Sequence, residues 1–182
     1  MRELSLNILD IVQNSITAGA SLITVRVEEV SAADRLTIAV EDNGKGMTAE
    51  QVARVMDPFY TTRTTRKVGM GIPLFRMAAE MTGGSLSIES ALGVGTTTAA
   101  TFCLSHIDRM PLGDIADTMV TLIRLNPQLD FVYRHTVDDK VFGLDTRALR
   151  DILGDVPLNE PEVIGWISDY FTQGLAELDS QA

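Results

Sequence analysis

The apolar and polar positions in the first half of the chain repeat with two different periods. Apolar side chains recur every three or four positions along residues 2–18, which predicts an amphipathic helix. They alternate with polar side chains along residues 22–30 and 35–41, which predicts two strands joined as a hairpin. Further on, the same periods predict a helix at 48–55, a helix ending at Met81, and strands at 85–89 and 96–104. An α/β domain is therefore expected.

The second half of the chain predicts fewer elements and carries a different charge. Its pattern gives a helix, a hairpin and two further helices, at residues 112–125, 131–144, 145–153 and 159–178. The net charge is −2 over residues 1–107 and −8 over residues 108–182. We therefore expect a domain of residues 1–107 followed by a small, acidic α+β extension of residues 108–182. The extension is either a docking surface for a basic partner or a solvated cap on the first domain.

Composition restricts the classes of function. The chain has 182 residues, 45% of them hydrophobic, which is enough for a packed core. Apolar runs fall short of the roughly 18 residues of a membrane span, and the N-terminal residues do not resemble a signal peptide. A net charge of −10 argues against general affinity for nucleic acid or anionic membranes. The single Cys103 excludes an internal disulfide framework. A cytoplasmic protein is expected.

The strand at residues 35–41 leads directly into an acid and a glycine-rich turn, with the letters DNGKGM at residues 42–47. Glycines tolerate positive φ and let the backbone approach a ligand closely. Asp42, at the end of the strand, needs a hydrogen-bond donor, and an amino group on a flat heterocycle would provide one. Because the letters DNG also form ordinary turns, this stretch has two interpretations.

A polar face runs along the first predicted helix. Asn7, Asp10 and Asn14 recur at intervals of three and four, and Asp10 and Asn14 are one turn apart and point the same way. Amide and carboxylate oxygens on one helical face suit a Mg²⁺ ion that keeps most of its waters and also contacts phosphates. The alternative is an ordinary solvated face.

A basic, threonine-rich stretch at residues 57–67 precedes a second glycine motif, GMG at residues 69–71. Glycines just before a helix, with Pro73 in its first turn, expose backbone N–H groups at a positive helix end. Such an end binds phosphate, and the upstream cations add counter-charge. The alternative is a flexible surface loop with a glycine hinge.

These stretches, in this order, resemble the ATP-binding domain that sensor histidine kinases share with the Hsp90 chaperones, the type II topoisomerases and the MutL repair proteins. The resemblance covers roughly the first 105 residues. Its motifs are Asn14, DNGKG at residues 42–46, PFY at 58–60, GMG at 69–71 and GVGTT at 93–97. It implies a two-layer α/β sandwich: a mixed, mostly antiparallel sheet with helices on one face, and ATP between the first helix and a lid.

The resemblance also implies a role for each matched position. Asn14 would ligate Mg²⁺, Asp42 would bind the adenine amino group, and Asp10 is the candidate catalytic residue. The residues expected to contact the cofactors, ATP and Mg²⁺, are Asn14, Asp42, Gly44, Gly46, Met47, Phe59, Thr61, Thr62, Arg63, Arg66, Lys67, Gly69, Met70, Gly71, Thr96 and Thr97.

Two features depart from the family pattern. The branch that hydrolyses ATP carries a glutamate where this chain has Asp10, which is one methylene shorter. Asp10 is therefore either a poor general base or a residue that only holds a water of Mg²⁺. The helical dimerisation segment of a histidine kinase is not expected here, so the chain is most similar to stand-alone histidine-kinase-like ATP-binding proteins of bacteria. The two histidines, His106 and His135, are either phosphoacceptors or structural residues.

Three functions follow from this resemblance. The first is a kinase that transfers phosphate to a histidine, serine or threonine of a separate partner protein. The second is a slow ATPase switch in which Asp10 is the base and lid closure alters a partner surface. The third is a nucleotide-sensing binding module without turnover.

Overall fold

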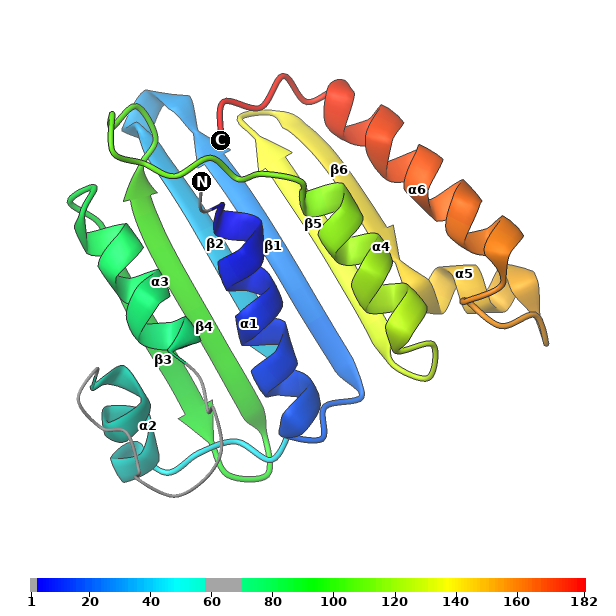
Figure 1. Cartoon of the computed structure of the whole chain (residues 1–182), viewed down its shortest axis with the longest axis horizontal. Coiled ribbons are helices and arrows are strands. Elements are labelled where there is room, and N and C mark those ends of the chain that lie inside the picture. Colours follow the sequence, from blue (N-terminus) through cyan, green and yellow to red (C-terminus); the bar gives the residue numbers. More distant parts are fainter. Residues whose placement is uncertain (1–2, 58–69) are drawn as a thin grey trace.

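The computed structural model describes residues 3–57 and 70–182, which form one six-stranded sheet and six α-helices (Figure 1). The strands are β1 (Leu22–Val30), β2 (Arg35–Asp42), β3 (Ser85–Ala91), β4 (Gly95–Cys103), β5 (Asp130–Val137) and β6 (Lys140–Asp145). The helices are α1 (Leu4–Thr17), α2 (Ala49–Met56), α3 (Gly71–Glu80), α4 (Ile115–Leu125), α5 (Thr146–Leu153) and α6 (Pro161–Ala176). The strand order is β3-β4-β2-β1-β5-β6.

One face of the sheet carries the core and the other face meets solvent. Along β1, Ile23, Val25 and Val27 are buried, whereas Arg26 and Glu28 are exposed. Figure 1 shows α1, α3 and α4 on the same side of the sheet. The structure is therefore a two-layer α/β sandwich of a mixed sheet with helices on one face, which confirms the predicted fold class.

The predicted first helix is observed as α1, with its apolar stripe packed on the sheet. Leu4 and Ile8 are fully buried. The first N–H groups of the helix find partners far along the chain. Leu4 N donates to the carbonyl of Pro111 at 2.9 Å, and Ser5 N donates to the carbonyl of Leu112 at 2.8 Å. The connection between β4 and α4 therefore satisfies groups that a helix start leaves unpaired.

The C-terminal region continues the same sheet. The predicted hairpin is observed as β5 and β6, and β5 pairs in parallel with β1, while the other neighbouring strands of the sheet run antiparallel. The helix predicted from an Asn159 cap begins instead at Pro161, with Glu160 at the cap position. The expected boundary at residue 108 stays a prediction, because strand pairing shows where the segment packs and not whether it is a separate unit.

A buried polar chain connects β1, β5 and the C-terminal residues. Glu29 and His135 are 0% and 1% exposed, respectively, and His135 Nε2 lies 2.9 Å from Glu29 Oε1. The Tyr133 hydroxyl lies 3.1 Å from His135 Nδ1. Ser180 Oγ and Gln181 N donate to the two oxygens of Glu29, at 2.5 and 2.9 Å. Since a carboxylate only accepts hydrogen bonds, His135 Nε2 is the donor to Glu29.

The charge of Glu29 follows from this network. Burial alone raises the pKa of Glu29, but hydrogen bonds from His135, Ser180 and Gln181 outweigh burial and bring the pKa below its usual value. Burial, reinforced by the charge of Glu29, also raises the pKa of Tyr133, which stays a neutral phenol. A group with a lowered folded pKa stabilises the fold above its unfolded pKa, and this stabilisation is lost as the pH falls through the folded pKa.

We expect Glu29→Gln to lower the free energy of unfolding by about 2 kcal/mol near neutral pH, because it removes hydrogen bonds to a buried charge. The difference from the unsubstituted protein should shrink in acid, where Glu29 becomes protonated. Urea unfolding at pH about 7 and about 3 measures both effects. Glu28→Gln, at the exposed neighbouring position, is the matched control. An equal loss at both pH values would contradict the assigned charge.

Candidate functional site

Asp42 lies at the C-terminal end of β2, half-buried, with both carboxylate oxygens engaged by donors. Ser15 Oγ, on α1, donates to Asp42 Oδ2 at 2.6 Å. The N–H of Gly44 donates to Asp42 Oδ1 at 2.9 Å. Because an ionised carboxylate has about four acceptor positions, these two bonds fix its orientation and leave capacity for a further donor.

The glycine turn after Asp42 packs so closely that only glycine fits. A Cβ on Gly44 would lie 2.9 Å from Ala18 Cβ, and a Cβ on Gly46 would lie 1.9 Å from the carbonyl oxygen of Ala91. Gly46 also has a φ of +69°, which favours glycine. Lys45 N donates to the carbonyl of Ala18 at 3.0 Å. The turn is therefore fixed between the end of α1 and the β3–β4 turn.

Two side chains outside the predicted set complete this attachment. The amide oxygen of Asn43 accepts from Ser21 N and Leu22 N, at 2.9 and 3.0 Å. On the other side, Ser90 Oγ accepts from Met47 N at 2.8 Å and lies 2.8 Å from Thr96 Oγ1. Asn43 thus ties the turn to the start of β1, and Ser90 ties it to the β3–β4 hairpin.

The register of β4 against β2 separates the two candidate threonines. Thr96 pairs with Asp42, and Thr97 pairs with Glu41. Directly opposed residues in a sheet share a face, so Thr96 lies on the helix-covered face with Asp42 and Thr97 lies on the other face. Thr98, which sequence reasoning did not select, returns to the first face and is 3% exposed.

The helix face predicted to hold Mg²⁺ is open, and it meets the second glycine motif. Asp10 and Asn14 are both exposed on α1. Gly71 begins α3, and a Cβ at Gly71 would lie 2.9 Å from Asp10 Cβ and 3.5 Å from Asp10 Oδ2. Met70, 61% exposed, precedes the helix and gives no side-chain cap to its first N–H groups. The positive end of α3 therefore lies beside Asp10.

The described residues thus form two parts of the predicted site. One contains Asp42 with the glycine turn, Met47 and Thr96, and the other contains Asp10, Asn14, Met70 and Gly71. The remaining predicted contacts lie outside the described residues and stay predictions: Phe59, Thr61, Thr62, Arg63, Arg66, Lys67 and Gly69.

Ser15 is the main contact that sequence reasoning missed. It falls on the apolar stripe of α1 and is 3% exposed, so its spacing in the helix predicts a core position. A hydroxyl at a buried helix position needs a hydrogen-bond partner. The sequence therefore indicates that Ser15 has a hydrogen-bond partner, but it does not identify Asp42, 27 positions away, as the acceptor.

The side-chain oxygens next to Gly71 are suitable ligands for a hard cation. Asp10 and Asn14 offer carboxylate and amide oxygens, which Mg²⁺ prefers. Within residues 3–57 and 70–182, no cluster of three or more His, Cys, Asp or Glu side chains is suited to a metal. Mg²⁺ bound to these two residues would take its other ligands from water and phosphate, as it does in many nucleotide sites.

The two histidines occupy different environments. His135 lies in the buried chain with Glu29. His106 is half-buried after β4, where its Nδ1 accepts from Asp108 N at 3.1 Å. Neither histidine lies on a helix.

Comparison with known proteins identifies the class to which this fold and site belong. The profile described as "Histidine kinase-, DNA gyrase B-, and HSP90-like ATPase" matches residues 2–106. The chain therefore belongs to this family, and membership implies that it binds ATP. The family segment contains α1, β1, β2, α2, α3, β3 and β4, and with them every predicted site residue.

Sensor kinases are among the relatives. The chain is 33% identical over 105 residues to the sensor protein ChvG of Agrobacterium fabrum, covering 54% of this chain and 17% of that protein. It is 36% identical over 110 residues to the sensor protein kinase FleS of Pseudomonas aeruginosa, covering 60% of this chain and 27% of that protein. The chain thus spans less than a third of the length of either relative.

A solved structure supports the fold. The N-terminal domain of a DNA repair protein superposes with a TM-score of 0.53 at 15% identity, covering 80% of this chain and 53% of that chain. At this identity the likeness concerns the fold alone. Among the helices of residues 3–57 and 70–182, none has both the length and the hydropathy needed to cross a membrane.

We expect Ser15→Ala to weaken ATP binding about tenfold, because Asp42 loses the donor that fixes Oδ2. Titration calorimetry with Mg-ATP measures the change. Ser5→Ala is the matched control, since Ser5 is also buried on α1 but bonds to Glu3. Equal affinities for the two variants would show that the Ser15 contact does not position Asp42 for the nucleotide.

Proposed function

We propose that this protein binds Mg-ATP and transfers its γ-phosphate to a separate partner protein. The observation that carries the proposal is the arrangement of Asp42. Its carboxylate is fixed by Ser15 and Gly44, retains acceptor capacity, and lies at the end of a strand beside a closely packed glycine turn. The ATP-binding family of the chain and its similarity to sensor kinases support the same reading.

In this proposal Asp42 recognises the base. Its carboxylate accepts a hydrogen bond from the adenine amino group, while Gly44 and Gly46 let the backbone approach the flat ring without a side chain in between. Thr96 and Met47 line the same turn through their shared partner, Ser90. Thr97, on the opposite face of the sheet, would reach the nucleotide only past the end of β4.

Asn14 and Asp10 bind the metal in this proposal, and the start of α3 binds phosphate. Mg²⁺, when bound, supplies charge neutralisation to the phosphates. Asn14 would hold the ion through its amide oxygen, and Asp10 would orient a water beside it. Gly69, Met70 and Gly71 supply backbone N–H groups at the positive end of α3. Phe59, Thr61, Thr62, Arg63, Arg66 and Lys67 complete the proposed contacts on the segment that precedes this helix.

A slow ATPase is the second candidate, and the position of Asp10 favours it. Asp10 lies against Gly71, at the helix end proposed for phosphate. A carboxylate there has access to a water that attacks phosphate, although its side chain is one methylene shorter than the glutamate of the hydrolysing branch. For either activity we propose a cytoplasmic protein that acts on another protein, which is consistent with one cysteine and a net charge of −10.

Asp42→Asn should weaken ATP binding by roughly 10- to 100-fold. The variant loses a hydrogen bond to a charged group, and its side-chain NH₂ can face the adenine amino group, so that two donors meet. Titration calorimetry is the measurement. Glu41→Gln, at the neighbouring position on the other face of β2, is the control because Glu41 pairs with Arg26 away from the site. An unchanged dissociation constant for Asp42→Asn would remove the basis of the proposal.

Incubation with γ-labelled ATP and an extract of the native cells tests transfer. A labelled second protein is expected with the unsubstituted chain and with Asn7→Ala, and a loss of at least tenfold is expected with Asn14→Ala, which removes the proposed metal ligand. The ATPase would be favoured instead if the pure protein released phosphate, Asp10→Ala abolished that release, and no partner protein was labelled. ATP binding with neither product would leave a nucleotide-sensing module.

A further inference from the structure

The surface between α5 and α6 contains an apolar groove that the nucleotide site does not use. It forms a cavity of about 390 Å³, and its lining residues are Leu149, Ile152, Leu153, Glu162, Val163 and Trp166. Two of these are strongly exposed for their type: Ile152 is 81% exposed and Trp166 is 51% exposed. Exposed apolar side chains that gather in one place on a surface commonly mark an interaction site.

Both walls of the groove are fixed in place. On α6, Trp166 stacks on Tyr170, with ring centroids 5.1 Å apart and an interplanar angle of 11°, and the Tyr170 hydroxyl donates to the carbonyl of Gly143 at 3.0 Å. A stacked and anchored tryptophan is a preorganised contact, which reduces the entropy lost on binding.

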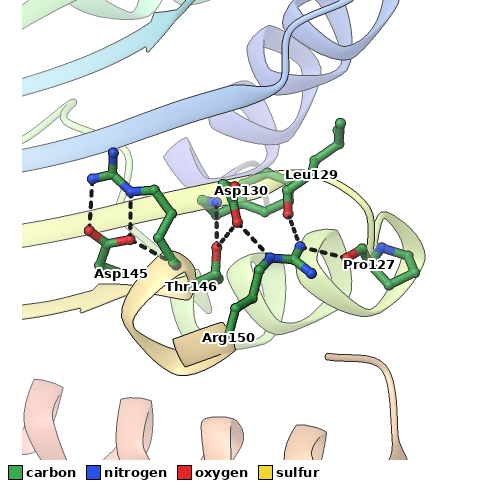
Figure 2. A network of polar contacts seen from close by, with 8 residues as sticks. Pro127, Leu129, Asp130, Asp145, Thr146 and Arg150 are labelled. Atoms are coloured by element: carbon green, nitrogen blue, oxygen red, sulfur yellow. Dashed lines mark hydrogen bonds and ion pairs between the residues drawn. The ribbon is translucent and has the colours of Figure 1, made fainter. Parts of the chain in front are cut away.

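The other wall, α5, is anchored by a polar network shown in Figure 2. Arg150 donates to Asp130 Oδ1 at 2.7 Å and to the carbonyls of Pro127 and Leu129 at 2.6 and 2.8 Å. Thr146 Oγ1 donates to Asp130 at 3.1 Å. These bonds connect α5 to the start of β5, so the groove does not depend on a partner for its shape.

The segment that forms the groove is acidic. The two arginines of α5 are already paired, Arg147 with Asp145 and Arg150 with Asp130. Glu162 lines the groove, and residues 151–182, which include all of α6, carry seven acidic residues and no Lys or Arg. An apolar groove in a strongly acidic segment is complementary to a ligand that is apolar on one side and basic on the rest of its surface.

We propose that this groove binds a basic amphipathic helix of another protein. A helix lays its apolar stripe, at positions i, i+3, i+4 and i+7, into a groove between two helices. Its flanking Lys and Arg residues would meet Glu162 and the other acids of this segment. Charge disfavours a second copy of this chain, since the net charge is −10 and one acidic segment would face another. An anionic lipid surface is repelled for the same reason.

The groove is separate from the proposed nucleotide site. Its helices pack near β5 and β6, at one edge of the sheet, whereas Asp42 and Gly71 lie with β2, β4 and α3 toward the other edge (Figure 1). A bound helix would therefore leave the nucleotide site accessible, and the docking surface does not depend on whether phosphate is transferred.

A fluorescein-labelled synthetic helix of 18 residues tests the proposal, with Leu at i, i+3, i+4 and i+7 and Lys or Arg elsewhere. Fluorescence anisotropy with the full chain should show saturable micromolar binding, and the emission of Trp166, the only tryptophan, should shift to shorter wavelength. A peptide with the same Leu positions and Glu in place of the cations should bind at least tenfold more weakly, as should a scrambled basic peptide of the same composition.

Matched variants distinguish the groove from general attraction to an acidic protein. Ile152→Glu should raise the dissociation constant at least tenfold, whereas Ile107→Glu, at a 93% exposed position outside the groove, should leave it unchanged. Glu162→Lys, in the lining of the groove, should also weaken binding, and Glu28→Lys, on the far face of the sheet, should not. Because Ile152 is exposed, its variant is expected to fold, and circular dichroism checks this.

Three results would overturn the proposal. One is equal binding of the ordered and scrambled basic peptides, or binding that Ile152→Glu does not change. Another is self-association of the unsubstituted chain in sedimentation that Ile152→Glu abolishes, which would assign the groove to a second copy. The third is Ile152-dependent binding to vesicles of phosphatidylglycerol, which would assign it to lipid.

Discussion

The candidate site depends on how closely three backbone segments approach one another at the end of β2. A Cβ on Gly95 would lie 1.9 Å from the carbonyl oxygen of Asp42, and Gly95 has a φ of +139°. Only glycine therefore lets β4 pair this far along β2. That pairing and the hydrogen bonds from Ser15 Oγ and Gly44 N keep the Asp42 carboxylate half-buried and in one orientation. An isolated aspartate side chain would rotate freely.

Local pattern and spacing were enough to predict most of the elements near the site. The predicted strands at 22–30 and 35–41 are observed as β1 and β2, and the helix predicted at 48–55 is observed as α2, which begins with a Thr48–Gln51 capping box. These features depend on neighbours in the chain, so the sequence contains their cause. The parallel pairing of β5 with β1 joins residues more than 100 positions apart, and no local signal specifies it.

The site itself was predicted only in part, for a related physical reason. Glycine motifs indicate close backbone approach, and they selected the turn that holds Asp42. The face of a strand residue depends on register, which is a tertiary property, so the sequence did not separate Thr96 from Thr97. Ser15 and Ser90 were missed because the sequence gives no sign of which distant group a serine on a helix or strand will contact. Residues 58–69 lie outside the described residues, so the roles given to them stay predictions.

The parallel junction between β1 and β5 has a consequence for any attempt to isolate the ATPase-family segment. A fragment ending at residue 106 would keep the family motifs but leave β1 as an open edge with unpaired backbone groups. It would also lose the carbonyls of Pro111 and Leu112 that receive the first N–H groups of α1. Edges of this kind recruit strands from other chains, so the isolated fragment would be prone to aggregate.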